Sequence, residues 1–325
     1  SALERIAPCL RTLRHADGGL ARFHGGGRGL EGRLDQALAA TGVRPAPTHA
    51  QGLAMGFARL SVGRTSVIVD AASPPGGAAG RSAHASTSAF EMTSGRRPLV
   101  VCCGSGGPFG AEWRQAGRAT ASHSTLAIEG YSSSRFAAGA GQDVLVDLAQ
   151  VTTLRASHLP EGPLLYLAHN GWSATHGLTH GRHLHLSADG RKLTGTDTLA
   201  AASAAERKRF EQVTQDGRMD AIGLDIRFHL HPDVDAALDL GGTAVSLALK
   251  SGEIWVFRHD GGAKLSLEPS VYLEKSRLKP RGARQIVLSA RAIDFETRIG
   301  WTLAKAQDTP LAIRDLGRED FPVPI

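Results

Sequence analysis

Hydrophobic residues near the start of the chain recur at helical spacing. They fall into two short sets, Leu3, Ile6, Leu10 and Leu13, then Leu30, Leu34 and Leu38. Apolar residues three or four positions apart share one face of an α-helix, so both sets predict short amphipathic helices. Pro8 is expected to kink the first helix or to begin a fresh turn, and the second helix is expected to end near Gly42.

After about residue 50 the hydrophobic period changes from 3.6 to 2, which is typical of β-strands. The predicted strands include Ala58–Val62, Val67–Val69, Ile226–Leu230, Val245–Leu249, Ile254–Phe257, Leu265–Leu267 and Ile286–Leu288. Turn signals such as Asp260-Gly261-Gly262 separate them. This spacing predicts a mainly β fold, either a sandwich or a large twisted sheet. One interruption, Ala200–Arg218, predicts a surface helix or a mobile loop.

Composition and charge narrow the function classes. The chain of 325 residues carries a net charge of +6, which favours polyanionic partners such as nucleic acid, anionic lipid or acidic glycan. Nucleic acid is disfavoured, because the densest basic run, Arg207-Lys208-Arg209, is short and no zinc-finger, basic-zipper or RNA-binding signature is present. The three cysteines, Cys9, Cys102 and Cys103, do not form a disulfide framework. No apolar stretch is long enough to predict a membrane span.

Five segments in the predicted β region form an ordered series of motifs: Ala83–Met92, Pro98–Gly104, Arg118–Leu126, His169–Trp172 and His180–Arg182. The series resembles the β half of the heparinase II/III-like polysaccharide lyases. That family has a His-Ala-Asp-Ala-like segment, a strand ending in a Val-Asp-Pro-Gly-like turn, and an Arg-Ser/Ala-Thr-Ala-Ala-His-Asn/Ser-Thr segment. His-Asp-Gly-Tyr and His-Arg-Arg motifs follow. The match at Arg118–Leu126 is the most specific.

The resemblance implies a large antiparallel β-sandwich (super-β-sandwich) preceded by an (α/α) toroid of helices. Residues 1–48 are then expected to be the end of the toroid with its linker, and residues 49–325 the β-sandwich domain. The rest of the toroid would lie upstream and contact this domain. The resemblance also implies a periplasmic or cell-envelope location. It leaves the oligomeric state open.

The reaction that the resemblance implies is β-elimination at the uronic acid of an anionic polysaccharide. A base removes a proton, a positive or hydrogen-bonding group stabilises the carboxylate, and an acid assists the leaving oxygen. The family's toroid supplies most of these groups, including a Tyr, whereas Tyr131, Tyr166 and Tyr272 lie outside such a context. We therefore assign no catalytic residue and expect the chain alone to be inactive.

A zinc site is also implied, because several relatives hold zinc beside the cleft. Carried onto this sequence, the ligands are His84, Cys102 and His123, with Cys in place of the usual Asp. Thiolate and imidazole are both good zinc ligands. The alternative is that the cysteines are small buried strand residues and the two histidines form hydrogen bonds. A second departure is Ser82, which stands where catalytic relatives have another His and cannot act as a proton carrier near neutral pH.

The same carry-over proposes substrate contacts at Arg118, His169, Trp172, His180 and Arg182. Guanidinium groups match planar anions, and Trp172 is the expected sugar-stacking residue; structural ion pairs are the alternative for the two arginines. The pairs His183/His185 and His229/His231 are more typical of the polar face of a half-buried strand, and Trp255 and Trp301 of core packing. Two other functions stay open: a non-catalytic carbohydrate-binding or scaffold module, and an independent His-rich metalloenzyme.

Overall fold

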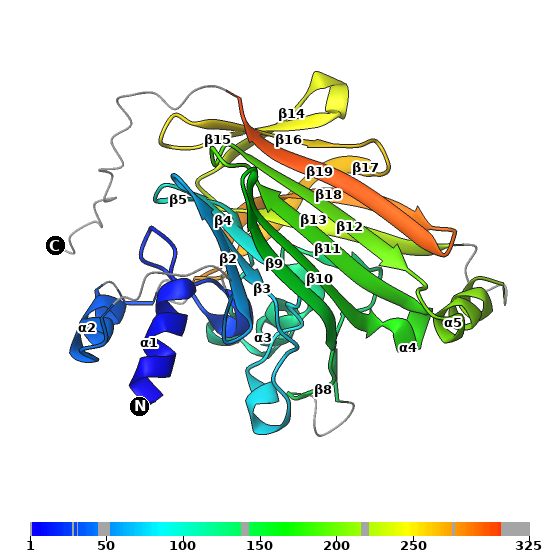
Figure 1. The fold of residues 1–325 in the computed structure, drawn as a ribbon, viewed down its shortest axis with the longest axis horizontal. Helices are drawn as coiled ribbons and strands as arrows, with labels where there is room; N and C mark the ends of the chain where they lie inside the picture. Colours follow the sequence, from blue (N-terminus) through cyan, green and yellow to red (C-terminus); the bar gives the residue numbers. More distant parts are fainter. Residues whose placement is uncertain are drawn as a thin grey trace.

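Two large antiparallel sheets packed face to face make up most of the protein (Figure 1). The structure is a computed structural model, and it describes residues 2–27, 29–30, 32–44, 53–137, 143–215, 221–274 and 277–306. The mainly β fold predicted from the hydrophobic period is confirmed, and of the two alternatives the sandwich is the correct one.

Short helices precede the sheets. Helix α1 spans Ala2–Thr12 and continues through Pro8, a turn of 3₁₀-helix (η1) covers Phe23–Gly25, and α2 spans Arg33–Ala40. The side chain of Arg59 fastens the end of α1 to the first sheet, because its Nη1 donates to the carbonyls of Thr12 and Arg14 at 3.1 and 2.7 Å. The predicted boundary after residue 48 lies outside the described residues, so the assignment of residues 1–48 to a toroid stays a prediction.

The first sheet has the strand order β1-β2-β3-β4-β5-β13-β18-β17, with β6 also paired to β13. Its strands are β1 Leu53–Ala54, β2 Phe57–Val62, β3 Thr65–Asp70, β4 Phe90–Ser94, β5 Arg97–Val101, β6 Leu126–Ile128, β13 Ile222–Leu230, β17 Lys264–Tyr272 and β18 Arg281–Ala292. Strands β3 and β4 are buried along their whole length, because the N-terminal segment covers the face of the sheet that the second sheet leaves free.

The second sheet has the order β14-β15-β16-β19-β12-β11-β10-β9. Its strands are β9 Val151–Leu159, β10 Gly162–Trp172, β11 Leu178–Leu186, β12 Lys192–Ala200, β14 Asp235–Asp239, β15 Ala244–Ala248, β16 Ile254–His259 and β19 Glu296–Lys305. A small separate ribbon pairs β7 Arg135–Phe136 with β8 Leu145–Asp147. Buried and exposed residues alternate along β11 and β12, as expected for a sheet with one face in the core.

The connections carry short helical elements. They are the helices α3 Ala111–Arg118, α4 Ser173–His176 and α5 Ala204–Gln215, and the 3₁₀ turns η2 Gly77–Arg81, η3 Gly107–Phe109, η4 Thr120–Ser122 and η6 Leu240–Gly242. Helix α5 resolves the alternative left open for Ala200–Arg218, as far as Gln215. None of the described helices is long and apolar enough to cross a membrane.

Aromatic rings from both sheets fill the core. Trp301 of β19 stacks on Phe90 of β4 with ring centroids 5.5 Å apart, and Phe228 of β13 meets Trp301 and Phe257 at 4.8 Å each. Gly195 of β12 makes room for this packing, since a Cβ there would overlap the indole of Trp301. The expectation that Trp255 and Trp301 belong to the core is confirmed, because both are buried.

Candidate functional site

Three histidines and an aspartate lie together where the N-terminal segment meets the first sheet. His84 Nδ1 lies 3.2 Å from His123 Nε2, a hydrogen-bonding distance. His24 Nδ1 accepts the backbone N–H of His84 at 3.0 Å, and His24 Nε2 lies 3.3 Å from a carboxylate oxygen of Asp70. Ser86 Oγ donates to the same carboxylate at 2.6 Å. We call His24, Asp70, His84 and His123 the histidine cluster.

Asp70, His84 and His123 are buried and His24 is half-buried, and this burial sets the protonation of the histidine cluster. Burial and the neighbouring charge of His84 hold the pKa of His123 well below its ordinary value, so this ring is neutral at pH 7. Burial also lowers the pKa of His24, but the charge of Asp70 outweighs it and the net shift is upward. Two buried atoms of the cluster, Asp70 Oδ1 and His123 Nδ1, have no hydrogen-bond partner. The cluster can therefore accept a further donor, such as a water molecule.

The cysteines predicted near this cluster face two different environments. Cys102 packs with Ala21, Phe23 and Ile68, and its backbone N–H donates to Glu91 Oε1 at 2.8 Å. Cys103 Sγ lies 3.5 Å from His229 Nδ1. Burial raises the pKa of the Cys103 thiol to about 11, so it is protonated at neutral pH.

The zinc prediction fits this arrangement only in part. Two imidazole nitrogens 3.2 Å apart can share one zinc, because Zn–N bonds of about 2.05 Å at the tetrahedral angle place such atoms roughly 3.4 Å apart. Among the described residues, however, no group of three or more His, Cys, Asp or Glu side chains is spaced to hold a metal ion. The structure thus brings His84 and His123 together without Cys102.

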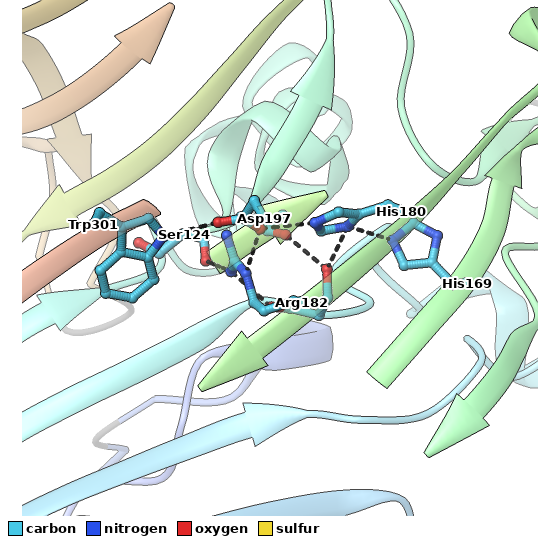
Figure 2. Close-up of polar contacts among 8 residues, drawn as sticks. Ser124, His169, His180, Arg182, Asp197 and Trp301 are labelled. Atoms are coloured by element: carbon cyan, nitrogen blue, oxygen red, sulfur yellow. Dashed lines mark hydrogen bonds and ion pairs between the residues drawn. The ribbon is translucent and has the colours of Figure 1, made fainter. Parts of the chain in front are cut away.

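A second polar network lies in the centre of the sandwich (Figure 2). Asp197 of β12 accepts hydrogen bonds from Arg182 Nε at 2.7 Å and from the indole of Trp301 at 2.8 Å. His180 Nε2 lies 2.7 Å from the same carboxylate, and its Nδ1 lies 3.1 Å from His169 Nε2. We call these residues the Asp197 network; each of them is at least 99% buried.

Charge compensation explains how this network survives burial. Burial raises the pKa of Asp197, but the charge of Arg182 and the hydrogen bond from His180 outweigh it, so the carboxyl stays ionised. Burial lowers the pKa of both histidines: that of His169 falls well below its ordinary value, and Asp197 partly offsets the fall for His180. Both imidazoles are therefore neutral at pH 7, and Arg182 with Asp197 is the one ion pair of the network.

The structure places the five predicted substrate contacts in the interior. His169, Trp172, His180 and Arg182 are each at most 1% exposed. Arg118 is 3% exposed and donates to the carbonyls of Gly80, Ala83 and Asp143 at 2.7 to 2.9 Å. A polysaccharide cannot reach side chains buried in this way. Arg182 forms the structural ion pair of the alternative, with Asp197, whereas Arg118 binds backbone carbonyls instead of a carboxylate.

Other residues surround the histidine cluster at the surface. A Cβ on Gly25 would lie 3.7 Å from His84 Nε2 and 3.6 Å from the Cβ of Ser105, so these three residues are neighbours. The backbone of Trp113 packs closely against Gly106, the residue after Ser105, and the Trp113 side chain is 36% exposed. Arg114 Nη2 donates to the carbonyl of Arg81. Arg114 Nη1 also forms a surface ion pair with Asp143 Oδ2 at 3.3 Å. We call Arg81, Ser105, Trp113 and Arg114 the rim; it contains two guanidinium groups and one indole.

Sequence reasoning missed His24, Asp70 and the rim residues Arg81, Ser105 and Arg114. The signal for His24 was present in the run His24-Gly25-Gly26-Gly27, because glycines allow a close approach of the backbone. His24 itself has φ 48° and ψ 36°, a left-handed conformation that is costly for a non-glycine residue. Its contacts with His84 and Asp70 compensate for this cost.

Comparison with known proteins gives consistent matches. A family model described as "Heparinase II/III-like, C-terminal" matches residues 44–302. FtsZ-localized protein C of Caulobacter vibrioides is 30% identical over 312 residues, which are 94% of this chain and 52% of that protein. The chain therefore spans about half the length of this curated relative.

Solved structures agree on the fold. Heparan sulfate lyase HepC from Pedobacter heparinus superposes with a TM-score of 0.62 at 13% identity, over 92% of this chain and 46% of that chain. A heparinase III gives a TM-score of 0.61 at 12% identity, over 94% of this chain and 47% of that chain. The shared feature is the architecture of the β half.

Removal of the charge on Asp197 tests the central network. Because Asp197→Asn leaves Arg182 charged and buried without its counter-ion, we expect a loss of about 3–5 kcal/mol in the free energy of unfolding, measured by urea denaturation. Asp147→Asn is the matched control, since Asp147 pairs with Arg135 at 2.9 Å on the surface and should cost less than about 1 kcal/mol. Equal small losses would contradict the structural role given to Asp197.

Because His169 and His180 are buried and neutral, we expect the free energy of unfolding to decrease as the pH is lowered. The pKa values of His169 and His180 are lowered in the folded state, so the unfolded chain binds more protons below its ordinary pKa of about 6.5. The contribution of each histidine to the free energy of unfolding is therefore fully present above that pH. It is lost as the pH falls, by up to about 1.4 kcal/mol per pH unit for each histidine. Urea denaturation from pH 7.5 to 5 checks this. His169→Gln should reduce the slope and the exposed His158→Gln should not; a flat profile would contradict it.

Proposed function

Because the chain belongs to the heparinase II/III-like C-terminal family, we propose that it is the β-sandwich part of a protein that acts on an anionic, uronic-acid-containing polysaccharide. The observation that carries this proposal is the rim. Arg81 and Arg114 have guanidinium groups that match carboxylate or sulfate, although Arg114 also pairs with Asp143 at the surface, and Trp113 offers a surface for a sugar ring. Arg81 lies three residues before His84, and the backbone of Trp113 and Arg114 packs against Gly106, next to Ser105.

We propose further that β-elimination requires groups from outside this chain. The imidazoles of His84 and His123 are 2% and 0% exposed and bind each other, so neither is free to take a proton from a polysaccharide. Ser82 is exposed next to this site, but a hydroxyl is a poor proton carrier at neutral pH. An upstream helical domain packed over the rim would supply an acid and a base. A periplasmic or cell-envelope location suits such a substrate.

A second candidate is a non-catalytic scaffold module, and the relative from Caulobacter vibrioides favours it. That protein is named for its localisation with FtsZ, and its 30% identity with this chain exceeds the 12–13% of the two lyases. In this alternative the sandwich serves as a positioning domain in a protein that localises with FtsZ. A fluorescent fusion of the full-length parent protein distinguishes the two, since a scaffold should colocalise with FtsZ after the rim residues are changed to alanine.

The chain alone is expected to be inactive as a lyase. It should be incubated with heparin, heparan sulfate, alginate and hyaluronan while the ultraviolet absorbance of unsaturated uronate is followed, with a commercial heparinase as the positive control. We expect no steady turnover, because no exposed acid–base pair lies at the rim. Turnover on any substrate that is lost in Trp113→Ala or Arg114→Ala would instead place a complete active site within the chain.

Zinc binding is tested by elemental analysis of protein purified without an affinity metal. We expect about one zinc per chain, lost in His84→Ala and in His123→Ala. Cys102→Ser should retain the metal, because Cys102 packs in an apolar cluster away from the imidazole pair. Metal-free protein would reject the zinc proposal. A metal lost in His183→Ala or His229→Ala instead would favour the independent metalloenzyme.

A further inference from the structure

The outer face of the second sheet is an open surface. Side chains alternate along each strand, so the residues between the buried Leu165, Leu167, Leu184 and Leu193 point away from the core. In Figure 1 the strands β10, β11, β12 and β19 run side by side, and α4 and α5 lie at one end of the sheet, away from its middle. The outward residues Tyr166, His183 and Thr196 are half-buried by their neighbours, as on a bare sheet.

An aromatic ring lies flat on this face. Tyr166 of β10 is directly opposite Arg155 of β9 on one side and His183 of β11 on the other. The Tyr166 hydroxyl comes within 3.1 Å of the point where a Cβ on Gly181 would stand, and ring atom Cζ within 3.6 Å. The ring therefore leans across β11, over a residue with no side chain, and Tyr166 stays partly exposed. The apolar C–H face of a sugar ring packs on such a platform.

Two exposed arginines flank the platform. Arg155 lies on β9, and Arg298 lies on β19 opposite Thr198 of β12. Four inter-strand spacings separate β9 from β19, which is roughly 19 Å and long enough for several sugar rings. Between them β12 presents the outward hydroxyls of Thr194, Thr196 and Thr198, which can donate to and accept from sugar hydroxyls.

Among the described residues, neither Arg155 nor Arg298 forms an ion pair with a carboxylate. Two carboxylates share this face. Asp260 lies over Gly300, where its oxygens accept the backbone N–H groups of Gly262 and Gly300 at 2.9 and 2.6 Å and keep their charge, and Glu296 lies two residues before Arg298 on β19. Arg258 lies near Asp239, which offsets its charge. Arg155 and Arg298, on either side of the platform, are therefore the cations that can meet an extended anionic chain.

We propose that this outer face, with Tyr166, Arg155 and Arg298, is a second polysaccharide-binding surface, separate from the rim. Tyr166 stacks on a sugar ring, and the two arginines bind carboxylate or sulfate groups on either side of it. The identity of the ligand rests on the proposed substrate class. The surface would hold a long polysaccharide chain to the protein while a different part of that chain occupies the rim.

The test is the dissociation constant of a heparin oligosaccharide, measured on the whole chain at low and at physiological salt. Tyr166→Ala and the double variant Arg155→Ala/Arg298→Ala should each weaken binding about tenfold, which corresponds to about 1.4 kcal/mol. Tyr166→Phe should bind as well as the unchanged protein, because it keeps the ring. The matched controls Tyr131→Ala and Arg96→Ala remove an exposed tyrosine and an exposed arginine elsewhere and should change little.

The outcomes separate this proposal from the proposed function. If Trp113→Ala and Arg114→Ala weaken binding while the face variants do not, the outer face is not a binding surface and the rim proposal stands. If a polynucleotide of equal charge binds as tightly and with the same dependence on Tyr166, the assignment to a polysaccharide is overturned. If no anionic polysaccharide binds the unchanged chain, the substrate class fails for both sites.

Discussion

The ion pair between Arg182 and Asp197 is the interaction on which the rest of the structure depends. Besides its bond to Asp197, Arg182 donates from Nη1 to the carbonyls of Ser88 and Ser124 at 2.9 and 3.0 Å. These two residues belong to the segments that carry His84 and His123. Arg182 Nη2 has no hydrogen-bond partner among the described residues. A charge buried in the core needs its counter-ion and hydrogen-bond partners in place, so the contacts with Asp197, Ser88 and Ser124 hold the sheet, both segments and Trp301 in one arrangement. The positions of His84 and His123 therefore depend on the pair Arg182 and Asp197, which belongs to the second sheet.

Buried carboxylates also join the N-terminal segment to the first sheet. Glu91 of β4 lies 3.0 Å from His15 Nε2 and 3.6 Å from Arg22 Nη1, while Asp70 of β3 pairs with His24. Burial raises the pKa of Glu91, but His15 and Arg22 outweigh it and the carboxyl stays ionised. Loss of either carboxylate would leave cations without partners at this interface. These contacts hold the N-terminal segment against the first sheet and so place His24 in the histidine cluster. The segment before residue 44 is therefore part of the candidate site.

The motifs that reveal the family describe its fold more than its substrate. His169, His180 and Arg182 were expected to touch a polysaccharide because they lie in family-like motifs, yet in this structure they belong to one buried network: Arg182 and His180 both bind Asp197, and His169 binds His180. The two surfaces proposed to bind a polyanion are built from residues outside those motifs, at Trp113 and Arg114 on the rim and at Arg155 and Tyr166 on the outer face. Two proteins can therefore share the motifs and the sandwich and still differ in what they bind.

The sequence by itself determined the β-sheet class, the short helices at the start and several strands, because period-2 alternation and turn residues are local properties. It missed most of residues 151–200, where His, Arg and Asp occupy inward positions of β10, β11 and β12 and hide the hydrophobic alternation. Only the tertiary structure decided that Arg182 finds Asp197 fifteen residues away, that Cys102 and His84 face different environments, and that His24 joins the histidine cluster. A polar residue in a strand can serve either the core or the surface, and which it serves depends on partners that no local pattern specifies.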